Sequence, residues 1–368
     1  MLSHLFSHLL KPLQIGAVSA PNRVVMAPLT RSRAKRPGDI PQAMNVQYYV
    51  QRASAGLIVT EASQISRQGQ GYAWTPGIYT DAQEAGWKSV VDAVHTAGGR
   101  MALQLWHVGR ISHSCFHDGG QPVAPSAIEA TASQCFAENP DGSAGYAPVT
   151  PPRALALAEI PDVIAQYRQA AQRAKRAGFD MVEIHAANGY LLQQFMATNS
   201  NLREDEYGGS LENRARLTLE AVDAAIAEMG AARVGVRISP HFAAHGIADS
   251  EAEPMALYLA RAFSERGIAY LHIAEPDWAG GPLLSDAFRQ QLRAAFTGSI
   301  ICCGNYNATE ADDLITSGLA DAVAFGRPFI ANPDLVARFA SSAELNKPDR
   351  ATFYGGDEKG YTDYPAMG

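Results

Sequence analysis

Residues 179–190 read FDMVEIHAANGY, and this stretch indicates the fold of the chain more clearly than any other. Its first six positions are mostly apolar, which is typical of a buried strand. Three side chains that form hydrogen bonds, His185, Asn188 and Tyr190, follow directly. In a barrel of parallel strands, the end where such residues gather is where chemistry takes place. Two donors able to hold one oxygen, with a phenol nearby, suggest reduction or proton transfer at an activated double bond.

Seven further short apolar runs alternate with longer helical patterns along the chain, and many of those helices end on glycine, the usual C-terminal stop. Eight strands in this alternation predict an α/β fold, a single (β/α)8 TIM barrel that forms one domain over residues 1–368. The expected strands are 24–27, 57–61, 101–106, 179–185, 234–238, 270–273, 300–303 and 322–325, and the expected helices are 82–96, 160–177, 211–229, 252–266, 286–296 and 309–317.

Two segments interrupt the alternation. Residues 107–158 are rich in Gly, Pro, Ser and Ala, and they separate the third strand from its helix. So long a connection in a barrel is usually functional, and we expect a capping excursion there. The tail from Lys347 to Gly368 is rich in Tyr, Gly and Asp, and we expect it to wrap a surface or reach the barrel mouth.

The composition narrows the classes of partner. A net charge of −7 argues against a nucleic-acid surface, which needs a clustered basic patch. The four cysteines show no C-x-x-C spacing, so we predict no metal site and a reducing compartment. Polar residues interrupt the first ten positions, and no stretch approaches a membrane span. We expect a cytoplasmic protein, monomeric or weakly dimeric, that acts on a small molecule and binds neither nucleic acid nor membrane.

Polar residues recur at one place on the expected strands, the carboxyl end. A polar side chain that points into a barrel costs a few kcal/mol if it is unsatisfied. Each one alone is most simply a satisfied rim residue, but seven coinciding strand ends favour a polar ligand. These positions are Pro28, Leu29 and Thr30 after the first strand, Glu61 and Ala62 after the second, Gln104 and Trp106 on the third, His185 on the fourth, Arg237 on the fifth, Gly304 and Asn305 after the seventh, and Gly326 and Arg327 after the eighth.

Gly304–Asn305 and Gly326–Arg327 follow the seventh and eighth strands, the region where barrels often hold a phosphate. Glycine allows close approach of backbone N–H groups, and arginine adds a bidentate contact. Alternatively, Gly326 serves a tight turn and Arg327 pairs with a nearby Asp. Gln104 combines an amide donor and acceptor, which suits the edge of a flavin pyrimidine, and Arg237 could stabilise the negative charge of a reduced flavin. The chain lacks both G-x-G-x-x-G after a strand and the P-loop motif.

The chain resembles the Old Yellow Enzyme family of flavin-dependent ene reductases. It most resembles the bacterial branch that contains N-ethylmaleimide reductase and the nitrate-ester reductases. The resemblance spans essentially the whole chain. The matching pieces are APNRVVMAPLTR (20–31), QRASAGLI (51–58), QLWHVGR (104–110), HAANGYLLQQF (185–195), YGGSLENR (207–214), DAVAFGRPFIANP (321–333), FYGG (353–356) and GYTDYP (360–365).

The resemblance implies a role for each matching residue. His185 and Asn188 would bind the activating oxygen of the substrate, and Tyr190 would donate the proton unless it only packs over the site. Tyr72, Trp106 and Tyr354 would line the substrate side. NADPH or NADH would reduce the flavin, and an alkene conjugated to a carbonyl or nitro group would then accept the hydride. Non-covalent FMN would be held by Pro28, Leu29, Thr30, Ala62, Gln104, His185, Arg237, Gly304, Asn305, Gly326 and Arg327.

Two other functions fit part of the pattern. In a cofactor-free isomerase or aldolase, His185 and Tyr190 would act as acid and base on a sugar phosphate. That hypothesis explains the two pairs expected to hold a phosphate, Gly304–Asn305 and Gly326–Arg327, but gives Gln104 and Trp106 no role. A ligand-binding protein without catalysis is the third possibility. A flavin absorbance spectrum distinguishes the cofactor-free isomerase or aldolase from the flavin enzyme.

Overall fold

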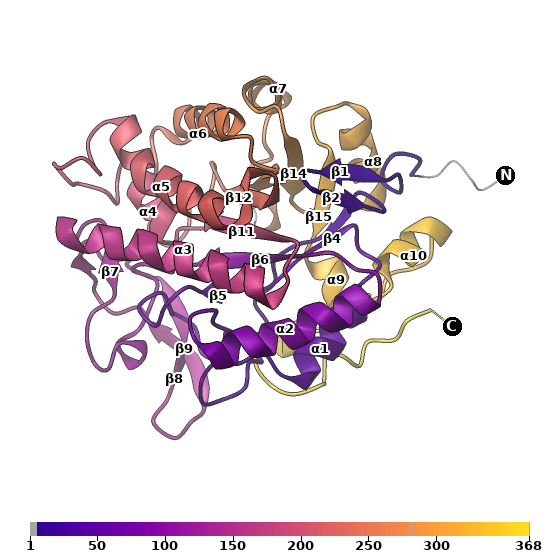
Figure 1. The fold of residues 1–368 in the computed structure, drawn as a ribbon, viewed down its shortest axis with the longest axis horizontal. Coiled ribbons are helices and arrows are strands. Elements are labelled where there is room, and N and C mark those ends of the chain that lie inside the picture. Colours follow the sequence, from indigo (N-terminus) through magenta and orange to yellow (C-terminus); the bar gives the residue numbers. More distant parts are fainter. Residues whose placement is uncertain (1–5, 280, 368) are drawn as a thin grey trace.

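Eight parallel strands close into a barrel in the computed structural model, which describes residues 6–279 and 281–367 (Figure 1). One strand, β11, pairs with β12 on one side and with β6 on the other, which closes the ring. The sequence prediction of eight strands is confirmed, with small differences at the ends. The strands are β3 (Val24–Met26), β4 (Leu57–Val59), β6 (Met101–Trp106), β11 (Met181–Ala186), β12 (Val234–Ile238), β13 (Tyr270–Ala274), β14 (Ser299–Cys303) and β15 (Ala322–Phe325).

Helices surround the barrel and cover the outer face of the strands (Figure 1). The six predicted helices are present, each within one residue of its predicted bounds, as α2 (Asp81–Thr96), α3 (Ile160–Ala177), α5 (Leu211–Met229), α6 (Ala252–Arg266), α7 (Asp286–Ala295) and α8 (Ala308–Thr316). Apolar side chains of these helices and of the strands form the main core. Four shorter helices were not predicted, namely α1 (Ala43–Val50), α4 (Leu191–Met196), α9 (Arg327–Ala331) and α10 (Leu335–Ser341).

A hairpin that the sequence analysis missed covers the amino-terminal end of the barrel. It consists of β1 (Leu13–Ile15) and β2 (Val18–Ala20), which pair antiparallel. Ile15 and Val18 are buried in one cluster with inward-facing strand residues such as Val25. This end of the barrel is therefore filled by apolar packing, and the opposite end is left for polar residues.

The expected excursion after β6 is confirmed. It contains the short strands β7 (Val123–Ala124) and β10 (Arg153–Ala154) and an antiparallel hairpin of β8 (Gln134–Glu138) and β9 (Ala144–Pro148). Buried apolar residues of the excursion pack against Tyr72 and Tyr190, which places it over the carboxyl end of the barrel.

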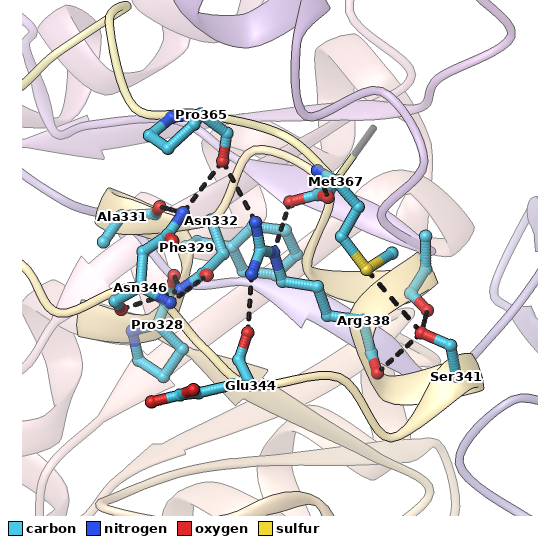
Figure 2. Close-up of polar contacts among 12 residues, drawn as sticks. Pro328, Phe329, Ala331, Asn332, Arg338, Ser341, Glu344, Asn346, Pro365 and Met367 are labelled. Atoms are coloured by element: carbon cyan, nitrogen blue, oxygen red, sulfur yellow. Dashed lines mark hydrogen bonds and ion pairs between the residues drawn. The ribbon is translucent and has the colours of Figure 1, made fainter.

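The C-terminal tail also reaches the barrel mouth, as expected. Arg31, just beyond β3, donates to the carbonyl oxygens of Phe353 at 3.0 Å and Gly360 at 2.7 Å. Further along, Pro365 accepts hydrogen bonds from Arg338 at 3.0 Å and from Asn346 at 2.8 Å (Figure 2). The tail is thus tied down at both of its ends, beside the first strand and beside α9 and α10. No helix in the described parts of the chain is long and apolar enough to cross a membrane.

Candidate active site

Most of the predicted site residues lie at or just beyond the carboxyl ends of the barrel strands, whereas Tyr72 lies in the connection between β4 and α2 and Tyr354 in the C-terminal tail. Parallel pairing brings these ends to one rim: Glu183 is level with Gln104, His185 with Arg237, and β14 lies beside β15. The Gly304–Asn305 and Gly326–Arg327 turns therefore leave neighbouring strands at the same rim. Ala62, Gln104, Trp106, His185 and Arg237 are buried, whereas Pro28, Leu29, Thr30, Tyr72, Asn188, Tyr190, Gly304, Gly326 and Arg327 are partly exposed, and Asn305 and Tyr354 are exposed.

The turn after β11 is held in an unusual backbone conformation. Asn188 has φ +55°, a left-handed conformation that asparagine tolerates better than most residues. Its backbone N–H donates to the Ser239 hydroxyl at 2.7 Å, and the N–H of Gly189 donates to the Gln193 side chain at 2.7 Å. The side-chain oxygen of Asn188 is buried and has no hydrogen-bond partner within the protein. The turn thus fixes the backbone at Asn188 and leaves the buried side-chain oxygen without a partner within the protein.

His185 is a neutral hydrogen-bond donor. Burial, assisted by the charge of Arg237, lowers its pKa to about 3, so the imidazole is uncharged at neutral pH. Its Nδ1 accepts the backbone N–H of Ala187 at 3.3 Å. A neutral imidazole that accepts at Nδ1 carries its proton on Nε2. His185 therefore presents an N–H through Nε2 without adding a charge to the site.

Aromatic rings form one wall around this histidine. Trp106 is nearly parallel to His185 at 6.2 Å between centroids, and Tyr72 stacks on Trp106 at 5.5 Å. Tyr190 lies edge-on to Trp106 at 4.9 Å, and its hydroxyl donates to that of Tyr72 at 3.1 Å. Burial raises the pKa of Tyr190 above its usual value, so the phenol keeps its proton at neutral pH. The structure brings the indole of Trp106, from the third expected strand, against the imidazole and the phenol that follow the fourth.

The barrel interior below the rim carries the two residues expected to face a flavin pyrimidine. Gln104 donates from Nε2 to Glu183 at 2.7 Å, and Arg237 donates to the sulfur of Cys303 at 3.5 Å. Arg237 Nε and Trp106 Nε1 are buried and have no protein partner. Buried polar groups are normally hydrogen-bonded, so these orphan donors fit a polar ligand such as FMN at the barrel mouth.

The two turns expected to hold a phosphate differ. At Gly326, a Cβ would meet nothing nearer than a methyl of Leu29 at 3.4 Å, so space remains in front of this backbone. At the other turn, the N–H of Asn305 donates to the carboxylate of Asp277 at 2.8 Å. That N–H is therefore engaged by an anion of the protein itself. The Gly326–Arg327 turn is the better candidate for binding a phosphate.

Comparisons with known proteins establish the family. The model of the NADH:flavin oxidoreductase / NADH oxidase family matches residues 8–346. The chain belongs to this family. Morphinone reductase, solved in complex with tetrahydroNAD, superposes with a TM-score of 0.95 at 58% identity and 98% coverage of both chains. An Old Yellow Enzyme homologue from Zymomonas mobilis superposes with a TM-score of 0.92 at 43% identity, over 98% of this chain and 99% of that one.

Two plant relatives also match almost the whole of this chain. The 12-oxophytodienoate reductase 1 of Oryza sativa subsp. japonica is 45% identical over 365 residues, which is 98% of this chain and 93% of the relative. The 12-oxophytodienoate reductase 2 of Arabidopsis thaliana is 42% identical over 363 residues, 98% and 96% of the two chains. The resemblance to Old Yellow Enzymes inferred from the sequence motifs is confirmed.

Several residues that shape the site escaped the sequence analysis. Glu183 and His272 lie inside the barrel and bond each other at 2.8 Å between Oε2 and Nδ1. Arg33 donates to carbonyl oxygens of the tail, including that of Asp357 at 2.9 Å. The sequence did contain a signal for Glu183 and His272, because a charged or polar residue flanked by apolar ones inside a buried strand requires a partner. No sequence pattern signalled the contacts of Arg33 with the tail.

Proposed function

We propose that this protein is an NAD(P)H-dependent FMN ene reductase that reduces the C=C bond of α,β-unsaturated carbonyl and nitro compounds. The observation that carries the proposal is the turn after β11. It presents a neutral imidazole N–H and the amide group of Asn188 beside a protonated phenol, and this set lies next to the buried pair Gln104 and Arg237. The carbonyl oxygen of an enone needs hydrogen-bond donors, and the α-carbon of the enone needs a proton donor.

The residues assigned to FMN fit the chemistry of that cofactor. Gln104 and Arg237 would face the pyrimidine, and the open backbone at Gly326 with Arg327 would hold the phosphate. Pro28, Leu29, Thr30, Ala62, His185, Gly304 and Asn305 would complete the binding site. The chemistry that bound FMN supplies is transfer of a hydride from NAD(P)H to the β-carbon of the alkene.

The protein's own groups account for the rest of the reaction. His185 Nε2–H and the Asn188 amide would hold the substrate oxygen while negative charge develops on it. Preorganised donors of this kind are each worth ~3 kcal/mol in a transition state. Tyr190 would deliver a proton to the α-carbon. To do so, its hydroxyl must exchange the hydrogen bond to Tyr72 for an approach to the substrate. Tyr72, Trp106 and Tyr354 would enclose the substrate and exclude water.

Finer features of the function are also proposals. Nitro compounds and nitrate esters would be further substrates, and NADPH or NADH the reductant. We further infer one FMN-binding domain over residues 1–368, with residues 107–158 as its cap. A cytoplasmic location, a monomer or weak homodimer, and the lack of nucleic-acid or membrane partners remain predictions from the composition.

Ligand titration of alanine variants tests the site. We expect His185→Ala and Asn188→Ala each to weaken binding of a simple phenol to the FMN-loaded protein by about tenfold, because each variant removes one donor. Flavin absorbance follows the titration, and FMN should stay bound. Asn139→Ala, at the exposed tip of the β8–β9 hairpin, is the matched control and should behave like the wild type. Phenol binding that is unchanged in both site variants would show that the assigned roles are wrong.

A further inference from the structure

A carboxylate lies fully buried inside the barrel, directly below the rim. Glu183 precedes His185 by two residues on β11, so both side chains point to the interior of the barrel. In register, Glu183 lies opposite Gln104 on β6, and His272 of β13 lies opposite Arg237 of β12. Polar side chains from four consecutive strands of the ring therefore gather in one cluster inside the barrel.

The contacts within this cluster are specific. Oε1 of Glu183 accepts Nε2–H of Gln104 at 2.7 Å, and Oε2 accepts Nδ1–H of His272 at 2.8 Å. Burial lowers the pKa of His272, so the imidazole is a neutral donor. Burial opposes ionisation of Glu183, but the interactions with His272, Arg237 and Gln104 outweigh it and keep its pKa below the usual range. Glu183 is thus an anion held by hydrogen bonds from Gln104 and His272, and the charge of Arg237 adds to its stabilisation.

The hydrogen bond to Glu183 fixes which way the Gln104 amide points. An amide has one oxygen and one NH2 group, and only the NH2 group can donate to a carboxylate. A flipped amide would place two oxygens against each other inside the barrel, where an unfavourable polar contact is costly. Gln104 therefore turns its Oε1 away from Glu183 and keeps that orientation.

We propose that Glu183 is a positioning residue of the flavin site: its carboxylate orients Gln104, balances the charge of Arg237, and thereby lowers the reduction potential of bound FMN. This inference rests on the proposed FMN site. A reduced flavin carries more negative charge than an oxidised one, so a fixed anion nearby disfavours reduction while Arg237 favours it. Without Glu183, only the charge of Arg237 remains in this cluster.

The test compares two carboxylate-to-amide substitutions, one within β11 and one just before it. Glu183→Gln keeps the size of the side chain and removes the charge. Asp180→Asn is the matched control, because Asp180 precedes β11 at the other end of the barrel and also bonds a histidine, His95, at 2.8 Å. We expect the midpoint potential of bound FMN in Glu183→Gln to rise by about 30 mV or more, a tenfold shift of a two-electron equilibrium. The control should stay at the wild-type value.

The outcomes separate this inference from the proposed function. If wild-type protein binds no FMN, both the proposed function and the inference are overturned. If wild-type protein binds FMN and Glu183→Gln leaves its potential unchanged, only the inference is overturned. Glu183→Asp provides a second test, which also serves if Glu183→Gln does not fold. It keeps the charge but is one methylene too short to hold Gln104, so we expect FMN to dissociate about tenfold more readily. Unchanged FMN affinity in that variant would contradict the positioning role.

Discussion

Among single residues, Tyr190 has the most sharply defined proposed role. Its phenol is protonated, hydrogen-bonded to Tyr72 and set edge-on against Trp106. Each of these contacts uses the ring or the hydroxyl of Tyr190, and only the hydroxyl is lost in phenylalanine. The substitution Tyr190→Phe therefore separates proton donation from packing.

We expect Tyr190→Phe to slow reoxidation of the enzyme by an enone about 100-fold, the usual contribution of a general acid. Reduction by NAD(P)H should change little, because that half-reaction needs no proton at carbon. Anaerobic stopped-flow absorbance measures both halves. Ferricyanide, which accepts electrons without a proton at carbon, is the control acceptor and should reoxidise variant and wild type alike. Equal slowing of both half-reactions would contradict the proton-donor role.

The residues at the rim were predictable because each follows an apolar strand, and parallel strands place their carboxyl ends together. Thus His185, Arg237 and Gln104 could be assigned to one site from the sequence alone. Glu183 and His272 could not be assigned in this way. The partner of a buried polar group depends on the register between strands, which the sequence does not give. The engagement of Asn305 by Asp277 likewise depends on a contact between two loops.

At the level of elements, the C-terminal tail depends on a short segment after β3. Arg33 donates to the carbonyl oxygens of Asp357 at 2.9 Å and Thr352 at 3.0 Å, and its guanidinium lies 4.7 Å from the centre of the Tyr361 ring. Tyr354, expected to line the substrate side, lies between these anchor points. The arginine therefore orders the tail at the barrel mouth.

We expect Arg33→Met to speed amide hydrogen exchange of residues 352–360 at least about tenfold, because hydrogen bonds from a charged donor each contribute about 1.5–3 kcal/mol. Mass spectrometry of the exchanged peptides measures this. Arg36→Met is the matched control, since Arg36 bonds Gly142 of the hairpin at 2.6 Å and not the tail. Exchange in the tail that is equally slow in Arg33→Met and wild type would show that the anchor lies elsewhere.

The strands and long helices were predictable because their apolar pattern is continuous and their ends carry glycine or polar residues. The β8–β9 hairpin was not, because its strands QCFAE and AGYAP are poor in β-branched residues. The turn between them, NPDGS, was a usable signal. The helix α1 has only eight residues, too few for a clear period.

For the molecule as a whole, buried neutral histidines make stability depend on pH. Burial lowers the pKa of His107 to about 3, and its Nδ1 accepts the N–H of Gly109 at 3.1 Å. Below pH ~6.5 the unfolded chain takes up a proton at this histidine and the folded barrel does not. The folded state therefore loses stability as the pH falls from 6.5 towards 3, by about 2 kcal/mol at pH 5.

The variant His107→Asn isolates this contribution, because asparagine can still accept the N–H of Gly109 and does not titrate. We expect the wild type to lose about 2 kcal/mol more than the variant between pH 7.5 and pH 5. Urea unfolding at the two pH values, followed by circular dichroism, measures the difference. The same loss in both proteins would mean that His107 is protonated in the folded state.

We propose that the rim of this barrel holds FMN and that hydride passes there from a nicotinamide to an activated alkene. Anaerobic absorbance spectroscopy of the FMN-loaded protein tests it most directly. We expect NADPH or NADH to bleach the flavin band and 2-cyclohexenone or N-ethylmaleimide then to restore it. A protein that stays colourless after incubation with FMN, or a bleached flavin that the alkene does not reoxidise, would contradict the claim.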